Sequence, residues 1–334
     1  MSEIPKTYVE TQNSPDKSKW DEAMSEEIEM MQSRKVWDLV EPNSNMKVLG
    51  CRFKNLPKKR VSLPFKVGCI LPERVKENEI EETELMRQFP YRTLIGCLYF
   101  IANRSRPDIE FAVNTMSQFC NGYTYHHWTV VVDILNYVFE TRHYKINLSD
   151  TRSNMLTMYS DSSWGCKLND RHSTSGYIMF FGNVPIVWKS QKQKCIALSS
   201  MEAEFIALTE SVKCIIWYSR ILKELNLIDF EIPEVYCDNQ AAIHFSKNNV
   251  ENNKTKHIDI KYKFVQKLLS ENEFYLKHIN SKKNLADFLT KPLVKEKLYS
   301  VIKHIFKMDS VTDGAECCIF KSSRGRSQRS NIIG

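Results

Sequence analysis

Four acidic residues occupy positions from which a folded chain could bring carboxylates together. Asp161 and Asp238 each end a short apolar stretch with strand character, in Tyr-Ser-Asp and Tyr-Cys-Asp. Because the carboxyl ends of strands joined by crossovers border a ligand crevice, we expect both at an edge where something can bind. Glu204 lies in the first turns of a predicted helix, and Asp287 in a predicted closing helix. Each acid taken singly is more simply a helix cap or a solvated surface group.

The chemistry of these acids changes if they converge. Neighbouring carboxylates repel one another, and their pKa values rise unless a cation neutralises them. Hard oxygen ligands of this kind suit Mg²⁺ or Mn²⁺. Two such ions about 4 Å apart can activate a water and stabilise the departing oxygen of an in-line phosphodiester displacement. The order of the residues along the chain leaves open whether the four meet.

The apolar pattern predicts a helical part followed by a mixed α/β part. Three helices are expected between residues 89 and 144, the second of them opened by Pro107. The expected strands are 155–161, 175–182, 184–189, 234–238 and 273–279. A long helix begins after Ser199, which forms a capping box with Glu202, and further helices are expected from Asn239, over 257–269 and near Asn284. Three successive strands with short turns indicate an antiparallel meander, and the later crossovers can be parallel.

The flanking segments differ in character from these two parts. Residues 1–54 are predicted to form an amphipathic helix and a short strand, and residues 55–84 a junction with clustered basic and then acidic residues. The helical part spans 85–148 and the mixed part 149–293. Residues 294–334 are expected to form a basic, partly disordered tail.

The composition is that of a globular protein with room for two domains. Of its 334 residues, 42% are hydrophobic and 26% charged. Its 10 Gly, 11 Pro, 17 Phe, 14 Tyr and 6 Trp residues exclude collagen-like, coiled-coil and disordered chains. No apolar run approaches the roughly 20 residues of a membrane span, and the N-terminus lacks a signal-peptide pattern, so we expect a cytoplasmic or nuclear location. The ten cysteines form no Cys-x-x-Cys pair, which favours reduced thiols over a zinc site. The net charge of +7 suits nucleic acid without requiring it.

Seven ordered segments carry a family resemblance. They are Tyr-Ser-Asp-Ser-Ser-Trp (159–164), Asn-Asp-Arg-His-Ser-Thr-Ser-Gly-Tyr (169–177), Trp-Lys-Ser-Gln-Lys-Gln (188–193), Ser-Ser-Met-Glu-Ala-Glu-Phe (199–205), Tyr-Cys-Asp-Asn-Gln-Ala-Ala (236–242), Thr-Lys-His-Ile-Asp-Ile (255–260) and Asn-Leu-Ala-Asp-Phe-Leu-Thr-Lys-Pro-Leu (284–293). Over about 150–293 the chain resembles the C-terminal ribonuclease H domain of copia-type (Ty1/copia) retrotransposon Pol polyproteins. The resemblance implies a ribonuclease H-like α/β fold: a five-stranded mixed sheet of three antiparallel and then two parallel strands, with helices on both faces.

The same resemblance implies the site residues. The family's four metal-binding carboxylates correspond to Asp161, Glu204, Asp238 and Asp287, which would hold two Mg²⁺ ions, with Mn²⁺ as the alternative. Glu202 is the rival of Glu204. Residues two apart on a helix point in different directions, so both cannot serve one site, and we prefer Glu204 because its surroundings resemble the family's helix. His278 resembles the family's mobile histidine, proposed to aid proton transfer or product release; the alternative is a surface histidine at a strand end.

The N-terminal half resembles reverse transcriptase with a large internal gap. Residues 20–24 and 37–40 resemble its opening, and residues 91–96 and 105–109 resemble the segment that joins polymerase to ribonuclease H. Only residues 55–84 stand where the family carries its fingers and palm, and the chain has neither a Tyr-x-Asp-Asp motif nor any Asp-Asp pair. We therefore expect a deleted palm and no DNA synthesis. An intact retroelement polymerase is a candidate partner.

A nuclease for an RNA–DNA hybrid must also hold two backbones and sense 2′-hydroxyls. Polar residues beside the third strand or directly after Asp238 are candidates for phosphate and sugar contacts, which fix position without reading bases: Lys189, Gln191, Lys192, Gln193, Lys194, Asn239 and Gln240. The alternative is a solvated edge strand protected by its lysines.

Two functions follow as hypotheses. The first is Mg²⁺-dependent endonucleolytic hydrolysis of the RNA strand of RNA–DNA hybrids. The second is a catalytically silent retroelement remnant that acts at most as a nucleic-acid-binding module.

Overall fold

The computed structural model describes residues 15, 17–19, 21–22, 25, 59–73, 86, 88–146, 148, 153–165, 171–225, 231–248 and 256–308. The chain divides into two units, residues 1–50 with 316–334 and residues 51–315. In the first unit the described residues include helical positions at 17–19, 21–22 and 25. The rest of the predicted N-terminal helix and strand, residues 55–58 and 74–84 of the junction, and the residues beyond 308 lie outside the described residues. The described residues from 59 to 308 all belong to the second unit.

A five-stranded mixed sheet organises the C-terminal part. Its strands are β2 (Leu156–Ser163), β3 (Thr174–Phe181), β4 (Val184–Lys192), β5 (Glu234–Cys237) and β6 (Tyr275–His278). They lie in the order β4-β3-β2-β5-β6. β2, β3 and β4 pair antiparallel, whereas β5 pairs parallel with β2 and with β6. This order and these orientations confirm the predicted ribonuclease H-like sheet.

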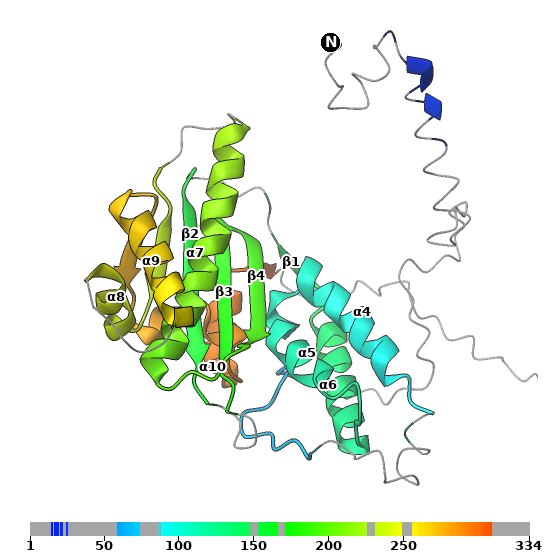
Figure 1. Cartoon of the computed structure of the whole chain (residues 1–334). Helices are drawn as coiled ribbons and strands as arrows, with labels where there is room; N and C mark the ends of the chain where they lie inside the picture. Colours follow the sequence, from blue (N-terminus) through cyan, green and yellow to red (C-terminus); the bar gives the residue numbers. More distant parts are fainter. Residues whose placement is uncertain are drawn as a thin grey trace, which may run out of the picture. The chain divides into compact units, whose positions relative to one another are not determined.

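Helices cover one face of the sheet because alternate strand residues supply an apolar surface. The covering helices are α7 (Ser200–Glu224), α8 (Gln240–Lys247) and α9 (Lys256–Ser270), and Figure 1 shows α7 lying across the middle strands. Met158 and Met179 on the strands pack with Phe205 and Val212 of α7 in the main core. The neighbouring strand residues Tyr159, Ile178 and Phe180 face the other side of the sheet and pack with the C-terminal segment.

The closing segment differs from the predicted helix near Asn284. It contains two single-turn 3-10 helices, η2 (Ser281–Lys283) and η3 (Asp287–Leu289). The Asn280 and Asn284 side chains accept the backbone N–H groups of Lys282 and Ala286 at 2.9 and 3.1 Å. Such local hydrogen bonds compete with those of a continuous helix, which gives a physical reason for the short turns.

The ordered fold also extends past the predicted boundary at residue 293. Helix α10 (Lys295–Ile302) places Leu298 and Val301 in the core on the second face of the sheet. Strand β7 (Phe306–Met308) then pairs antiparallel with β1 (Tyr144–Ile146), which follows the helical part. Residues 295–308 therefore belong to the folded unit, because their apolar side chains cover a face of the sheet that the preceding helices leave open.

The predicted helical part is present and borders strand β4 (Figure 1). Its elements are α4 (Tyr91–Arg104), η1 (Pro107–Ile109), α5 (Glu110–Ser117) and α6 (Tyr125–Glu140). The side chain of Asn114 donates a hydrogen bond to the backbone carbonyl of Ser190 at 2.7 Å, and Trp188 on β4 donates to the carbonyl of Ala102 at 2.8 Å. The helices thus cover an edge strand whose backbone would otherwise be open to pairing with another chain.

A buried ion pair holds the helical part together. Arg106 donates to Asp108 through Nε at 2.9 Å, and Tyr137 donates to the same carboxylate at 2.8 Å. The guanidinium lies over the rings of Tyr144 and Phe306, at 5.6 and 5.8 Å from their centroids. Because these two rings belong to β1 and β7, the pair also ties the helices to the C-terminal strand.

Within the described residues, no helix is long and apolar enough to cross a membrane.

Gly176 gives a test of the packing on the second face of the sheet. It pairs with Asp161 in the β2–β3 register, and an added Cβ would lie 2.7 Å from Leu289 Cβ and 2.7 Å from Thr290 Cγ2. Gly176→Ala is therefore expected to lower the free energy of unfolding by about 1–3 kcal/mol, measured by chemical denaturation. Gly96→Ala on α4 is the control, because nothing lies within 4 Å of the added carbon; it should leave stability unchanged or raise it by up to about 1 kcal/mol. Equal stability of both variants would contradict this packing.

Candidate metal centre

The pairing of β2 with β5 brings two of the predicted acids together. The parallel register places Ser160 beside Cys237, so that the next residues, Asp161 and Asp238, lie at the same edge of the sheet. Asp287 begins η3 on the second face, and Glu204 lies in the first turns of α7. The four acids thus come from strand β2, the end of strand β5, the turn η3 and the helix α7, which are far apart in the sequence.

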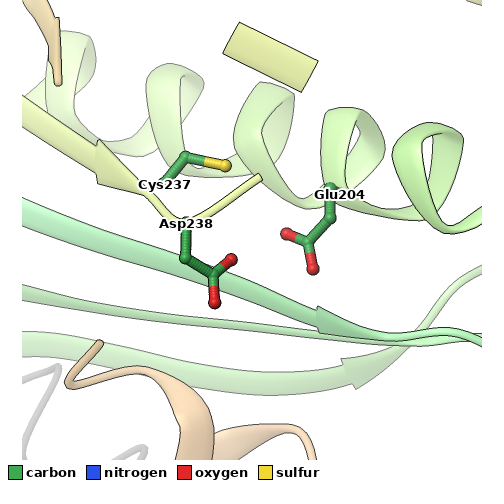
Figure 2. A group of neighbouring side chains, drawn as sticks. All are labelled: Glu204, Cys237 and Asp238. Atoms are coloured by element: carbon green, nitrogen blue, oxygen red, sulfur yellow. The ribbon is translucent and has the colours of Figure 1, made fainter. Parts of the chain in front are cut away.

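The four acids converge through Asp238. Carboxylate oxygens of Asp161, Asp238 and Asp287 lie within 4.8 Å of one another. Ligand atoms of Glu204, Asp238 and Cys237 form a second group within the same limit. Figure 2 shows the carboxylates of Glu204 and Asp238 directed into the same space from α7 and from the end of β5. Since Asp238 belongs to both groups, the four carboxylates form one cluster.

Glu204 and its rival Glu202 have different environments. One oxygen of Glu204 accepts the backbone N–H of Ser162 at 3.2 Å, while its buried Oε2 has no hydrogen-bond partner in the described structure. Glu202 accepts the backbone N–H of Leu198 at 2.9 Å and lies at the start of α7. The predicted capping box is therefore half present: Ser199 accepts the N–H of Glu202, but Glu202 caps Leu198 and not Ser199. Of the two acids, Glu204 is the one whose carboxylate reaches the cluster.

Two lysines and a threonine surround the deepest acids, and sequence reasoning did not single them out. Lys291 Nζ lies 3.1 Å from Asp287 Oδ1 and 3.5 Å from Asp161 Oδ2. Lys297, on α10, pairs with the other oxygen of Asp287, and the Thr290 hydroxyl donates to Asp161. Thr290 and Lys291 belong to the Leu-Thr-Lys-Pro part of the last family motif, which could have drawn attention to them. Their importance depends on the burial of Asp287, which the sequence alone does not show.

Burial and like charge dominate the electrostatics of the cluster. The pKa of Asp161 is raised to about 7, mainly by burial and also by the charges of Asp287 and Asp238, against the opposing effects of Lys291 and Thr290. Burial, with the charges of Asp161 and Asp238, raises the pKa of Glu204 to about 9. Burial acts to lower the pKa of Lys291, but the charges of Asp161 and Asp287 outweigh it and raise that pKa. Ionising all four carboxylates would therefore place more negative charge in the cluster than its two lysines compensate.

These residues fit a divalent cation. Carboxylate oxygens are the ligands that Mg²⁺ and Mn²⁺ prefer, and Glu204 offers a buried oxygen that no protein group satisfies. A cation among these carboxylates would remove the repulsion that raises their pKa values. The neighbouring Cys237 thiol is buried, and burial followed by the charge of Glu204 raises its pKa, so it remains neutral. A neutral thiol is a poor ligand for a hard cation.

His278 and the proposed substrate residues lie around the sheet edge. His278 is exposed at the end of β6, in register with Cys237. On β4, Lys189 and Gln191 share one face and Lys192 points to the other, because side chains alternate along a strand. Exposed Lys194 follows the strand. The structure therefore does not bring these β4 residues together as one surface.

Two of the predicted contact residues have structural partners. Gln193 is buried and donates to Ser175 Oγ at 2.8 Å and to the carbonyl of Ala203 at 2.9 Å. The prediction that Gln193 contacts the phosphates or sugars of a nucleic acid is therefore wrong. Asn239 caps α8 by accepting the N–H of Ala242 at 2.9 Å. Gln240, the first residue of that helix, is exposed.

The raised acid pKa values predict a pH dependence for the metal-free protein. Asp161 and Glu204 bind protons more tightly in the folded chain than at their ordinary values of 3.8 and 4.5. Their contribution to stability is fully present below those ordinary values and is lost as pH rises through about 7 and about 9. In EDTA, the free energy of unfolding should therefore fall between about pH 5 and pH 9, measured by urea denaturation. Excess Mg²⁺ should reduce the fall, and so should Glu204→Gln. A level or rising profile in EDTA would contradict the buried cluster.

Comparison with known proteins identifies relatives among transposon polyproteins. No family model matches the chain. The Retrovirus-related Pol polyprotein from transposon TNT 1-94 of Nicotiana tabacum is 34% identical over 278 residues, which are 83% of this chain and 21% of that protein. The corresponding polyprotein from transposon RE1 of Arabidopsis thaliana is 36% identical over 211 residues, 63% of this chain and 14% of that protein. The chain thus spans about a fifth or less of the length of these relatives.

Two further matches cover a smaller share of the chain. The secreted RxLR effector protein 161 of Plasmopara viticola is 33% identical over 132 residues, 40% of this chain and 93% of that protein. The crystal structure of LC11-RNase H1 in complex with an RNA/DNA hybrid matches with a TM-score of 0.32 at 16% identity, over 40% of this chain and 93% of that one. The homologues of this chain are thus copia-type Pol polyproteins of transposons, to parts of which it is similar.

Proposed function

We propose that this chain is a Mg²⁺-dependent ribonuclease H that hydrolyses the RNA strand of RNA–DNA hybrids and leaves 3′-hydroxyl and 5′-phosphate ends. The observation that carries the proposal is the convergence of Asp161, Glu204, Asp238 and Asp287, with a buried Glu204 oxygen that lacks a protein partner. Its similarity to transposon Pol polyproteins and its ribonuclease H-like sheet support a role of the ribonuclease H type.

The four carboxylates have distinct tasks in this proposal. Asp238 belongs to both groups of ligand atoms, so Asp161, Glu204, Asp238 and Asp287 would together hold the divalent ions. Bound divalent ions would supply an activated water and stabilise the departing oxygen. The Ser162 N–H fixes Glu204, and Thr290 fixes Asp161, so that both acids are oriented before substrate binds.

Residues around the sheet edge would handle the substrate. Because the β4 residues do not form one surface, we propose separate contacts to phosphates and sugars: Lys189 and Gln191 on one face of β4, Lys192 on the other, and Lys194, Asn239 and Gln240 beyond the strand ends. His278 is exposed at the strand end next to the cluster edge and is proposed to aid proton transfer or product release. With no Asp-Asp pair in the chain, we propose no polymerase activity, and an intact retroelement polymerase remains the proposed partner.

A matched pair of glutamates tests the catalytic proposal. Glu204→Gln should lower the rate of hybrid cleavage with Mg²⁺ by at least about a hundredfold, since it removes a charged ligand of the reacting centre. Glu202→Gln, two residues away, should leave the rate within a few-fold because its carboxylate caps a backbone N–H. Asp161→Asn should behave like Glu204→Gln. The assay measures cleavage of a labelled RNA–DNA hybrid. Equal cleavage by the wild type and by Asp161→Asn would reject the proposal that this chain is a nuclease.

A second function is favoured by the lysines at Asp287. Because Lys291 and Lys297 form ion pairs with its two oxygens, part of the cluster is neutralised without any metal. We therefore keep the alternative of a catalytically silent module that binds nucleic acid. Measurable hybrid binding, with no Mg²⁺-dependent cleavage by the wild type, would favour this alternative.

The substrate residues predict a salt dependence of hybrid binding. In an Asp161→Asn background, replacing Lys189, Lys192 and Lys194 by Ala should weaken binding. It should also reduce the slope of log affinity against log salt by about one unit for each phosphate that is deprived of its lysine. Fluorescence anisotropy across a salt series measures both. Lys295→Ala, which removes an exposed lysine at the start of α10, is the control. An unchanged slope in the triple variant would remove these lysines from the interface.

A further inference from the structure

The acidic cluster has two unlike halves. On one side Glu204 and Asp238 face each other, and the buried Glu204 Oε2 has no hydrogen-bond partner among the described residues. On the other side Asp161 and Asp287 share the ammonium group of Lys291, at 3.5 and 3.1 Å. One half therefore lacks a cation, whereas the other already contains two that belong to the chain: Lys291 and, at the other Asp287 oxygen, Lys297.

The chain builds this lysine contact with several interactions. Lys291 follows Asp287 by four residues, and between them Thr290 donates to the Asp161 carboxylate. The same segment is anchored upstream, where Asn284 donates to the carbonyl of Ser160 at 2.9 Å. Gly176 allows it to approach β3 closely, since any Cβ there would meet Leu289 and Thr290 at 2.7 Å. The position of Lys291 is thus set by a packed backbone segment.

An ammonium group and a divalent ion compete for the same oxygens. Lys291 is a compact charge with three donors, and the two carboxylates it contacts are those that would ligate an ion on this side. Two cations a few ångströms apart repel one another strongly in a partly buried site. An ion can therefore bind Asp161 and Asp287 fully only when the lysine leaves. The Lys291 side chain is 38% exposed, so solvent is accessible to it.

We infer that Lys291 occupies the place of the second divalent cation in the metal-free protein, so that the two ions bind with unequal affinity and the weaker one displaces the lysine. This inference rests on the proposed function only in taking the four acids as ligands of divalent ions. It adds that the ion on the Glu204–Asp238 side binds first. It also makes Lys291 a positioning residue that holds Asp161 and Asp287 in place until the second ion arrives.

Binding of Mn²⁺ alone to the full chain tests the inference without substrate. Electron paramagnetic resonance of free Mn²⁺ should give one tight ion in the wild type and a second that binds at least tenfold more weakly. Lys291→Met should strengthen the second ion at least tenfold, whereas Lys291→Arg should keep the wild-type isotherm. Lys295→Met removes an equal charge from an exposed position on α10 and should change neither affinity.

Thermal unfolding gives a second readout. In EDTA, Lys291→Met should melt at a lower temperature than the wild type, because the buried Asp161 and Asp287 lose a counter-charge. Saturating Mn²⁺ should restore most of that loss. If Lys291→Met does not fold in EDTA, the Mn²⁺ isotherms of Lys291→Gln and of the wild type still decide whether Lys291 weakens binding of the second ion.

The possible failures are distinguishable. Two ions of equal affinity in the wild type, or an unchanged isotherm in Lys291→Met or Lys291→Gln, would overturn the inference about Lys291 even if hybrid cleavage proceeds. A wild type that binds no Mn²⁺ and cleaves no hybrid would overturn the proposed function as well.

Discussion

Buried like charges are the constraint on which this structure depends. Asp161 and Asp287 are 1% and 0% exposed and Glu204 is 7% exposed, yet their carboxylates lie around a shared Asp238. Water cannot compensate charges at this depth, so they must be neutralised by protonation, by lysines or by bound cations. The structure shows the lysines of the C-terminal segment on one side and a Glu204 oxygen without a partner on the other.

The fold provides this arrangement through packing far from the acids themselves. Parallel pairing of β2 with β5 aligns Asp161 with Asp238, and the apolar stripe of α7 sets the height of Glu204 over the sheet. The C-terminal segment delivers Asp287 and Lys291 from the opposite face. The helices of 88–146 cover strand β4 and contact β7 through Arg106. The part that resembles a reverse transcriptase connection therefore supports the sheet that carries the acids.

Much of this could be predicted from the sequence, for identifiable reasons. Strong period-two and helical patterns indicated the five strands and α7, and the strand-end positions of Asp161 and Asp238 follow from those patterns. Short-range patterns could not reveal that Asn280 and Asn284 stop a helix by bonding to nearby backbone groups. They also could not show that residues 298–306 are core, because the face they cover exists only after the sheet has formed. Lys291 was missed for the same reason: its partner Asp161 is 130 residues away, as the two residue numbers show.

Anomalous diffraction from crystals grown with Mn²⁺ would show directly whether the four carboxylates hold divalent cations. We predict anomalous density coordinated by Glu204 Oε2 and Asp238, and at higher Mn²⁺ a second peak bordered by Asp161 and Asp287, with the Lys291 ammonium moved away. A cluster without anomalous density at saturating Mn²⁺, in which the same lysine contacts persist, would contradict the proposed metal centre.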